Sequence, residues 1–282
     1  SLPLHVADAF RAVLLDEGRD PALTAQILTL PGENEIAELF EVIDPQAITV
    51  VREALVRTLA AELADEFYAV YNANQQGEYR IEHDAMGQRA LKNVCLYYLA
   101  FGETTLADRL VQTQYQQANN MTDALAALAA SVAAQLPCRG ALLAHYDERW
   151  HRDGLVMDKW LMLQATSPSP DVLQKVRELL HHRSFTMSNP NRIRALIGAF
   201  VSGNPAAFHA KDGSGYQFLV EMLTDLNTRN PQVAARMIEP LIRLKRYDAD
   251  RQALMRQALE TLQGLDKLSG DLYEKITRAL NA

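Results

Sequence analysis

The sequence predicts an all-α fold: a superhelical solenoid of antiparallel helix pairs, in the manner of HEAT or armadillo repeats. Apolar residues recur every three or four positions along most of the 282-residue chain. The connecting segments are short and rich in Gly, Pro, Asn, Asp and Ser. We find no convincing alternating strand pattern. Because a dozen or more short helices do not fit around one bundle core, we expect each pair to pack on the next.

The helices are expected in close succession, and their repeats are degenerate because no fixed period aligns. The first is the amphipathic pattern at the N-terminus, and "NEIAELFEVI" follows from Asn34. Residues 44–74 predict the longest helix, with Asp44 as N-cap and Pro45 at the first helical position. Further helices are predicted at 83–100, 104–118, 121–136, 138–154, 155–166, 170–183, 191–203, 216–230, 232–247, 248–265 and 270–282. No Pro- or Gly-rich linker is long enough to separate two domains, so residues 1–282 are predicted to form one helical-repeat domain.

Composition excludes several classes of protein. A formal net charge of −7 disfavours a nucleic-acid partner, and no window approaches 18 uninterrupted apolar residues, so no membrane span is expected. The N-terminus lacks the basic start and cleavage site of a signal peptide. It begins within a helical pattern, which favours a chain cut from a longer polypeptide. The two cysteines, Cys95 and Cys138, lie in different segments, which suits a reducing cytoplasm.

Charge is unevenly distributed along the chain. Residues 1–66 hold 13 acidic residues and 4 Arg, a net charge of −9, whereas residues 172–256 hold 13 Lys/Arg and 7 acidic residues, a net charge of +6. One interpretation is two solvated surfaces of opposite sign. The alternative is that the basic segment faces an anionic partner.

Catalytic motifs are not found in the sequence. The chain has seven His, none spaced four apart as in HExxH, and the adjacent His181 and His182 point about 100° apart on a helix, so surface or helix-end roles are expected. Cys95 is predicted to be a core residue. Cys138 lies at a helix start, where the dipole lowers a thiol pKa, but no base lies nearby in the sequence. The Gly213-Ser214-Gly215 run predicts a flexible turn.

The most suggestive surface is basic. The segment "MSNPNRIRALIGAF" begins a helix with Asn189 as cap and Pro190 at the first position, and it carries Arg192 and Arg194. A second Asn-Pro start precedes Arg236. A guanidinium is a planar donor suited to a carboxylate, such as a peptide C-terminus. The alternative is that these arginines pair with Asp or Glu on neighbouring helices.

Several runs carry a resemblance to a known family. They include "LPGENEIAELFEVIDPQAI", "GQRALKNVCLYYL", "GLVMDKWLMLQA", "NPNRIRALIGAF", "GSGYQFL", "NPQVAARMIEPL", "RYDADRQ" and "LSGDLYEKITRAL". In order and spacing they resemble the C-terminal helical domain of bacterial aminopeptidase N, the alanyl-type M1-family zinc metallopeptidase. The resemblance extends from about residue 28 to the C-terminus. The family's HExxH helix, zinc glutamate, GxMEN motif and catalytic tyrosine belong to an upstream thermolysin-like domain and have no counterpart in this sequence.

The resemblance implies a cytoplasmic chain that cannot hydrolyse peptides alone and holds no cofactor, the zinc lying in the catalytic domain. This domain would cap that partner domain of the same polypeptide, limit access to short peptides and send arginines toward the substrate chamber. By motif match these substrate-binding residues are Arg194 and Arg236, whereas Arg192 is expected at the surface or in a salt bridge. A standalone helical-repeat module that binds a protein or peptide remains the alternative.

Overall fold

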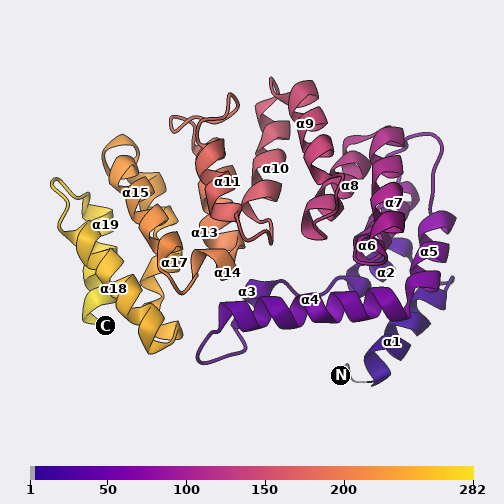
Figure 1. Cartoon of the computed structure of the whole chain (residues 1–282), viewed down its shortest axis with the longest axis horizontal. Helices are drawn as coiled ribbons and strands as arrows, with labels where there is room; N and C mark the ends of the chain where they lie inside the picture. The colour runs from indigo at the N-terminus through magenta and orange to yellow at the C-terminus, as the bar shows by residue number, and fades with distance from the viewer. Residues whose placement is uncertain (1–3) are drawn as a thin grey trace. The chain divides into compact units, whose positions relative to one another are not determined.

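The structure is a computed structural model that describes residues 4–282. The chain divides into two compact units. The first comprises Ser1–Pro31 and Val50–Arg149, and the second comprises Gly32–Thr49 and Trp150–Ala282. In each unit, consecutive helices joined by short connections fold back beside one another (Figure 1). Short Gly-, Pro- and Asn-containing connectors favour this antiparallel packing of consecutive helices.

The first unit is organised around helix α6, His83–Ala100, which packs against α2, α5, α7 and α8. Its helices are α1 (Leu4–Leu15), α2 (Pro21–Leu28), α4 (Pro45–Glu62, whose first turn belongs to the second unit), α5 (Ala64–Ala73), α6, α7 (Thr104–Gln117), α8 (Met121–Ala133) and α9 (Arg139–Trp150, which ends in the second unit). The bounds of α6 are those that the sequence predicts. Leu91, Cys95 and Tyr98 lie on its apolar face and are buried.

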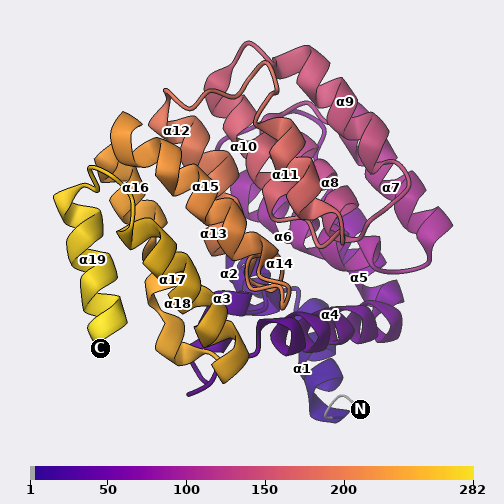
Figure 2. The same cartoon turned by 60° about the vertical axis from the view of Figure 1, so that its left-hand side comes forward.

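The second unit contains more and shorter helices, and in it α18 packs against both α15 and α19 (Figure 2). Its elements are α3 (Glu33–Ala37), α10 (Gly154–Ala165), α11 (Val172–Leu179), α12 (Pro190–Ile193), the π-helix η1 (Arg194–Gly198), α13 (Ala199–Gly203), α14 (Pro205–Phe208), α15 (Ser214–Arg229), α16 (Pro231–Met237), α17 (Glu239–Ile242), the 3-10 helix η2 (Leu244–Arg246), α18 (Ala249–Gln263) and α19 (Gly270–Asn281).

The all-α prediction is confirmed. Within residues 4–282 no strand is formed, and the isolated parallel bridge between Ile43 and Tyr247 is the sole β-type pairing. Several predicted helices are shorter than expected, and the one predicted over 232–247 is divided into α16, α17 and η2. The helix predicted over 44–74 breaks at Leu63, whose φ of −114° and ψ of 20° leave the helical region, because its fully buried side chain turns the chain into α5. The helix predicted from Asn34 ends at Ala37, and the residues after it lead to the bridge.

A buried polar network ties α6, α7 and α8 together in the first unit. Lys92 Nζ lies 2.7 Å from Asp123 Oδ2, and Asn93 donates to Asp123 Oδ1 at 3.0 Å. Gln114 donates to Asn93 at 2.8 Å and accepts from the Tyr71 hydroxyl at 2.7 Å. Burying polar groups costs free energy unless each has a hydrogen-bond partner, and each of these side chains has one.

The second unit holds a buried histidine among aromatic rings. His209 stacks on Tyr247 at a ring-centroid distance of 4.2 Å, and its Nδ1 lies 2.7 Å from the Tyr216 hydroxyl. Its carbonyl oxygen accepts from Arg251 Nε at 2.9 Å. Burial, reinforced by the Arg251 charge, lowers the pKa of His209 to about 3, so this ring is neutral at physiological pH.

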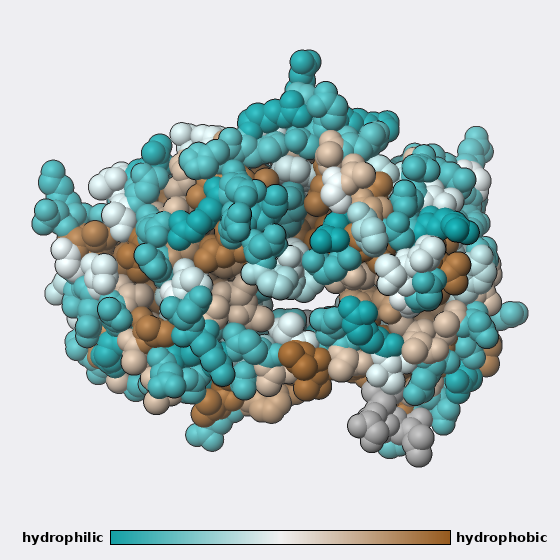
Figure 3. Space-filling view, viewed as in Figure 1, coloured by the Kyte–Doolittle hydropathy of each residue, from teal (hydrophilic) through white to brown (hydrophobic). Residues whose placement is uncertain are grey.

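The face seen in Figure 3 is mainly hydrophilic, with apolar groups scattered among the polar ones. None of the described helices combines the length and the apolar character needed to cross a membrane.

Candidate anion-binding surface

The candidate site is built on the interrupted helix of residues 190–203. Asn189 caps it as predicted, its Oδ1 accepting from the Asn191 amide at 2.9 Å, and Pro190 takes the first position. The helix then widens into a π-helical turn over Arg194–Gly198 before it resumes as α13. The buried face of this helix is formed by Ala195, Leu196, Ile197 and Phe200, which are all at most 3% exposed. Single π-turns within α-helices are frequent at functional sites.

Arg192 is a buried ion-pair residue. Its side chain is 9% exposed, and its Nε lies 3.1 Å from Asp158 Oδ1 on α10. Of the two roles expected, surface or salt bridge, the salt bridge is confirmed. Room for the guanidinium is provided by Gly154, since a Cβ there would lie 2.1 Å from Arg192 Nη2. Burial raises the pKa of Asp158, against the opposing charges of Arg192 and Arg194.

Arg194 is exposed, and its contacts differ from those of Arg192. Its Nη2 donates to Asn191 Oδ1 at 2.6 Å, one turn earlier. An amide oxygen carries no net charge, so this hydrogen bond orients the guanidinium and leaves its positive charge uncompensated. Asp158 is near enough for the charge of Arg194 to lower its pKa, yet the ion pair of Asp158 is with Arg192.

Arg236 lies on α16 and is exposed. Its side chain has no hydrogen bond or ion pair with any other of residues 4–282. The next residue, Met237, is buried against the π-helical turn: its Sδ and Cε lie 3.5 Å from the position of a Cβ on Gly198. The structure therefore places Arg194 and Arg236 on two helices that touch each other.

Most other arginines of the basic segment are neutralised. The ion pairs are Arg177–Glu221, Arg229–Asp225, Arg243–Glu38, Arg246–Glu38 and Arg251–Asp248. Pairing with carboxylates, the alternative considered for all three candidate arginines, holds for Arg192 and not for Arg194 or Arg236 within the described residues. Two exposed guanidiniums on adjoining helices, without a carboxylate partner, are a surface that favours an anion.

Gly154, Asp158 and Asn191 shape this surface and were missed by sequence reasoning. The signal was present in the spacing: Gly154 and Asp158 are four residues apart and so share a helix face, where a small residue beside a carboxylate leaves room for a cation.

The remaining candidates have structural roles. Cys95 is fully buried, as predicted, and Cys138 is buried too. The pKa of Cys138 is raised to about 12 by burial and by Asp108, so the helix start does not activate this thiol. His209 follows the last residue of α14, so the expected helix-end position is found for it. It is not at the surface, because it is only 2% exposed.

The predicted flexible turn at 213–215 is tightly constrained. Gly213 has a φ of 77°, and a Cβ on Gly215 would lie 2.0 Å from the Phe208 carbonyl oxygen. The turn therefore packs against α14 instead of forming a phosphate-binding loop. Among residues 4–282, no three His, Cys, Asp or Glu side chains come together in a way that could hold a metal ion.

A helical-repeat domain is the class of protein that these features define. The chain belongs to the family described as "Domain of unknown function (DUF3458_C) ARM repeats", which matches residues 1–281.

Its relatives are bacterial aminopeptidases. The chain is 73% identical over 280 residues to aminopeptidase N of Escherichia coli K12, and the match covers 99% of this chain and 32% of that protein. It is 48% identical over 276 residues to aminopeptidase N of Haemophilus influenzae, covering 98% of this chain and again 32% of the relative. The fold also matches a crystal structure of Legionella pneumophila aminopeptidase A in complex with aspartic acid, with a TM-score of 0.90 and 28% identity over 100% of this chain and 34% of that one. The chain thus spans about a third of the length of the relatives it matches.

Proposed function

We propose that the chain is the C-terminal part of a cytoplasmic zinc aminopeptidase of the M1 family, which removes N-terminal residues from peptides. In this proposal the chain forms one helical-repeat domain that caps the substrate chamber, limits entry to short peptides and presents Arg194 and Arg236 to them. The high identity to aminopeptidase N along almost the whole chain supports the parent activity. Two free, buried cysteines suit a reducing cytoplasm.

The observation that carries the role of the arginines is that neither is paired with a carboxylate among residues 4–282. A short peptide whose amine is held at a catalytic centre has its anionic carboxylate at the far end. A guanidinium that already pairs with Asp or Glu, as Arg192 does, has little attraction left for that carboxylate. Arg194 and Arg236 have no carboxylate partner among the described residues, so they retain their attraction for the peptide carboxylate. In a chamber with little water, screening is weak and the attraction is stronger than on an open surface.

The residues of this chain bind and orient the peptide in this proposal, and they take no part in bond cleavage. The zinc that the family implies would polarise the peptide carbonyl and activate water. The described residues do not fit such a site, because no set of metal-ligating side chains converges among them. The metal would therefore be held by the remainder of the polypeptide.

The experiment compares substrates in the complete polypeptide carrying Arg236→Ala. A tripeptide with a free carboxylate should lose about tenfold or more in kcat/KM, since hydrogen bonds to charged groups contribute roughly 1.5–3 kcal/mol. The same tripeptide ending in an amide should lose little. Arg229→Ala is the matched control, because Arg229 is exposed but paired with Asp225. Equal losses on both tripeptides would refute carboxylate recognition.

A second measurement separates the aminopeptidase from a standalone binding module. The isolated chain and the complete polypeptide are each given an aminoacyl-arylamide, with and without a chelator. Chelator-sensitive turnover is expected from the complete polypeptide alone. Robust turnover by residues 1–282 would contradict the proposal, and so would a complete polypeptide without turnover.

A further inference from the structure

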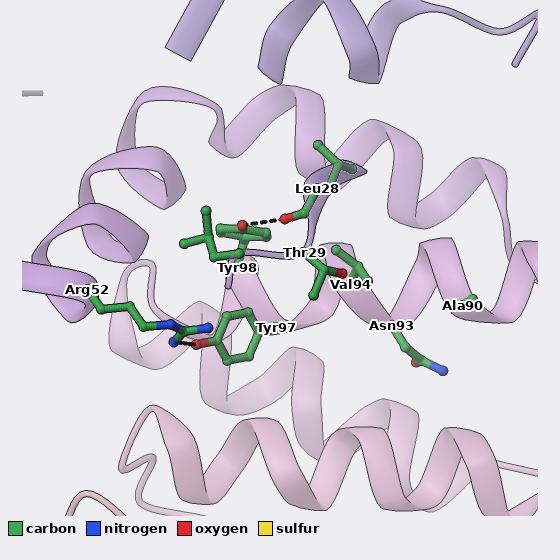
Figure 4. A pocket seen from close by; sticks show the side chains of 9 residues that line it. Leu28, Thr29, Arg52, Ala90, Asn93, Val94, Tyr97 and Tyr98 are labelled. Atoms are coloured by element: carbon green, nitrogen blue, oxygen red, sulfur yellow. Dashed lines mark hydrogen bonds between the residues drawn. The ribbon is translucent and has the colours of Figure 1, made fainter. Parts of the chain in front are cut away.

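A pocket of about 380 Å³ lies in the first unit, far along the chain from the arginines discussed above. It is lined by Leu28, Thr29, Leu30, Arg52, Ala90, Asn93, Val94, Tyr97 and Tyr98, contributed by α2 and the residues after it, α4 and α6. Figure 4 shows the aliphatic and aromatic side chains around the space, with the guanidinium of Arg52 at one side. The volume is within the range typical of small-molecule sites.

The aromatic wall of the pocket is held in place from behind. The Tyr98 hydroxyl donates to the Leu28 carbonyl oxygen at 2.6 Å, and the Tyr98 ring stacks on Phe67 at 4.5 Å. Tyr97 makes edge contacts with Tyr98 at 5.6 Å and with Phe101 at 5.2 Å. Because these rings pack on each other and on Phe67 and Phe101, which do not line the pocket, the pocket does not depend on a ligand to form.

Arg52 gives the pocket its charge. Its Nε donates to the Pro31 carbonyl oxygen at 2.8 Å, and its Nη1 donates to the Tyr97 hydroxyl at 3.3 Å (Figure 4). Both acceptors are neutral, and no carboxylate among residues 4–282 lies within ion-pair distance of Arg52. Arg57, on the same helix, pairs with Glu53 at 2.8 Å. The cation at the pocket is therefore oriented but not neutralised.

The hydrogen-bond donors of the pocket that are not used within the described residues indicate which kind of ligand it binds. Nη2 of Arg52 has no acceptor among the described residues, and the Tyr97 hydroxyl, which accepts from Arg52, still has its own proton to give. A carboxylate offers the two acceptor oxygens that these donors require. None of the nine described lining residues is acidic, so an ammonium group would find no carboxylate partner in the lining.

We propose that this pocket binds a small monocarboxylate with an apolar body and no amine, such as an arylalkanoic acid. The carboxylate lies on Arg52 and Tyr97, and the apolar body lies against Leu28, Val94 and Tyr98. A volume of about 380 Å³ is large enough for a single aromatic acid. The inference is independent of the proposed aminopeptidase function, because it uses none of the same residues.

The test is calorimetric titration of the full chain with 3-phenylpropionate, its amide and phenylalanine. The carboxylate should bind at least tenfold more tightly than the amide, which keeps the shape and removes the charge, and more tightly than the zwitterionic amino acid. Arg52→Met should reduce the affinity for 3-phenylpropionate by at least tenfold and leave that for the amide unchanged. Arg57→Met, on the same helix and outside the pocket, should bind like the parent chain.

Further variants separate this pocket from other basic surfaces. Val94→Phe, which fills the space and keeps Arg52, should abolish binding, whereas the double variant Arg194→Ala/Arg236→Ala should retain it. Circular dichroism checks that each variant is folded. The proposal is overturned if 3-phenylpropionate does not bind at millimolar concentration, or if Arg52→Met and Val94→Phe bind it unchanged. It is also overturned if the isolated chain binds 3-phenylpropionate and the complete polypeptide does not, because the pocket is then covered by another part of the protein.

Discussion

The ammonium group of Lys92 lies 2.7 Å from a carboxylate oxygen of Asp123, and each side chain is less than a tenth exposed. Burial alone would raise the pKa of Asp123, yet hydrogen bonds from Lys92, Asn93 and Asn120 lower it. The charges therefore exist as a pair within the core, and each depends on the other for its solvation.

Lys92→Met should be strongly destabilising, because it leaves the Asp123 carboxylate buried without its cation. We expect the free energy of unfolding to fall by about 3–5 kcal/mol, measured by urea denaturation. The double change Lys92→Met/Asp123→Leu should recover much of that loss, since it removes both charges. Lys175→Met, which breaks an exposed pair with Glu178, is the control and should change little. A loss for Lys92→Met as small as that for Lys175→Met would show that the pair is not buried in solution.

His209 predicts how stability depends on pH. Its pKa is lowered from 6.5 to about 3 by burial, with the charge of Arg251 adding to the effect. As the pH falls below 6.5, the unfolded chain therefore takes up a proton on this histidine and the folded chain does not. The contribution of His209 to the free energy of unfolding is fully present above pH 6.5 and is lost progressively as the pH falls toward 3. This one group contributes a slope of up to about 1.4 kcal/mol per pH unit.

His209→Phe should make the loss of stability between pH 6.5 and 4 shallower by about that slope, because it removes the titrating group. The measurement is urea denaturation at several pH values. His181→Gln, at an exposed position, is the matched control and should keep the parent slope. An unchanged slope in His209→Phe would mean that His209 is protonated within the fold.

Gly154→Ala should displace the Arg192 guanidinium from Asp158, because the new Cβ would occupy its place. We expect a loss of about 1–3 kcal/mol in the free energy of unfolding. In an Arg192→Met background the same change should cost much less, and this coupling identifies the cause. Gly140→Ala, also in the first turn of a helix, has open space around its Cβ position and should be neutral or stabilising. Equal losses with and without Arg192 would locate the strain elsewhere.

Asn191→Ala tests how far Arg194 depends on being oriented. The change removes the hydrogen bond to Arg194 Nη2 and leaves the charge. In the complete polypeptide, KM for a peptide with a free carboxylate should rise less than in Arg194→Ala, and kcat should be unchanged, because the residue affects binding only. Arg194→Lys should resemble Arg194→Ala more than the parent if the planar fork matters. An effect of Asn191→Ala on amide-terminated peptides of the same size would contradict this role.

Local rules accounted for much of the fold. Periodicity predicted the bounds of α6, and the predicted caps Asp44 and Asn189 form the hydrogen bonds that their sequence positions indicate. The break at Leu63 could not be predicted, because "AAELADEF" is a good helical pattern and the buried environment of Leu63 overrides it.

The site was less predictable than the fold. The distinction between Arg192 and Arg194 depends on Asp158, more than 30 residues earlier in the sequence, and on the space that Gly154 leaves. Neither is visible from the arginine helix alone. The role of Arg194 and Arg236 rests on resemblance and stays a prediction. The pocket at Arg52 was not foreseen, because its lining comes from three separate segments.

The π-helical turn at Arg194–Gly198 makes this helix sensitive to its length. An α-helix advances 100° per residue, so one residue too many would rotate every later side chain by that angle. The widened turn takes up the extra residue, and Phe200 still reaches the core although Arg194 faces outward. A single deletion within the turn would close it to ordinary helix and leave the later side chains in phase, whereas a further insertion would have no widened turn to absorb it and would rotate them all. Substitutions at Arg194 alter one charge, whereas that insertion would misalign everything that follows.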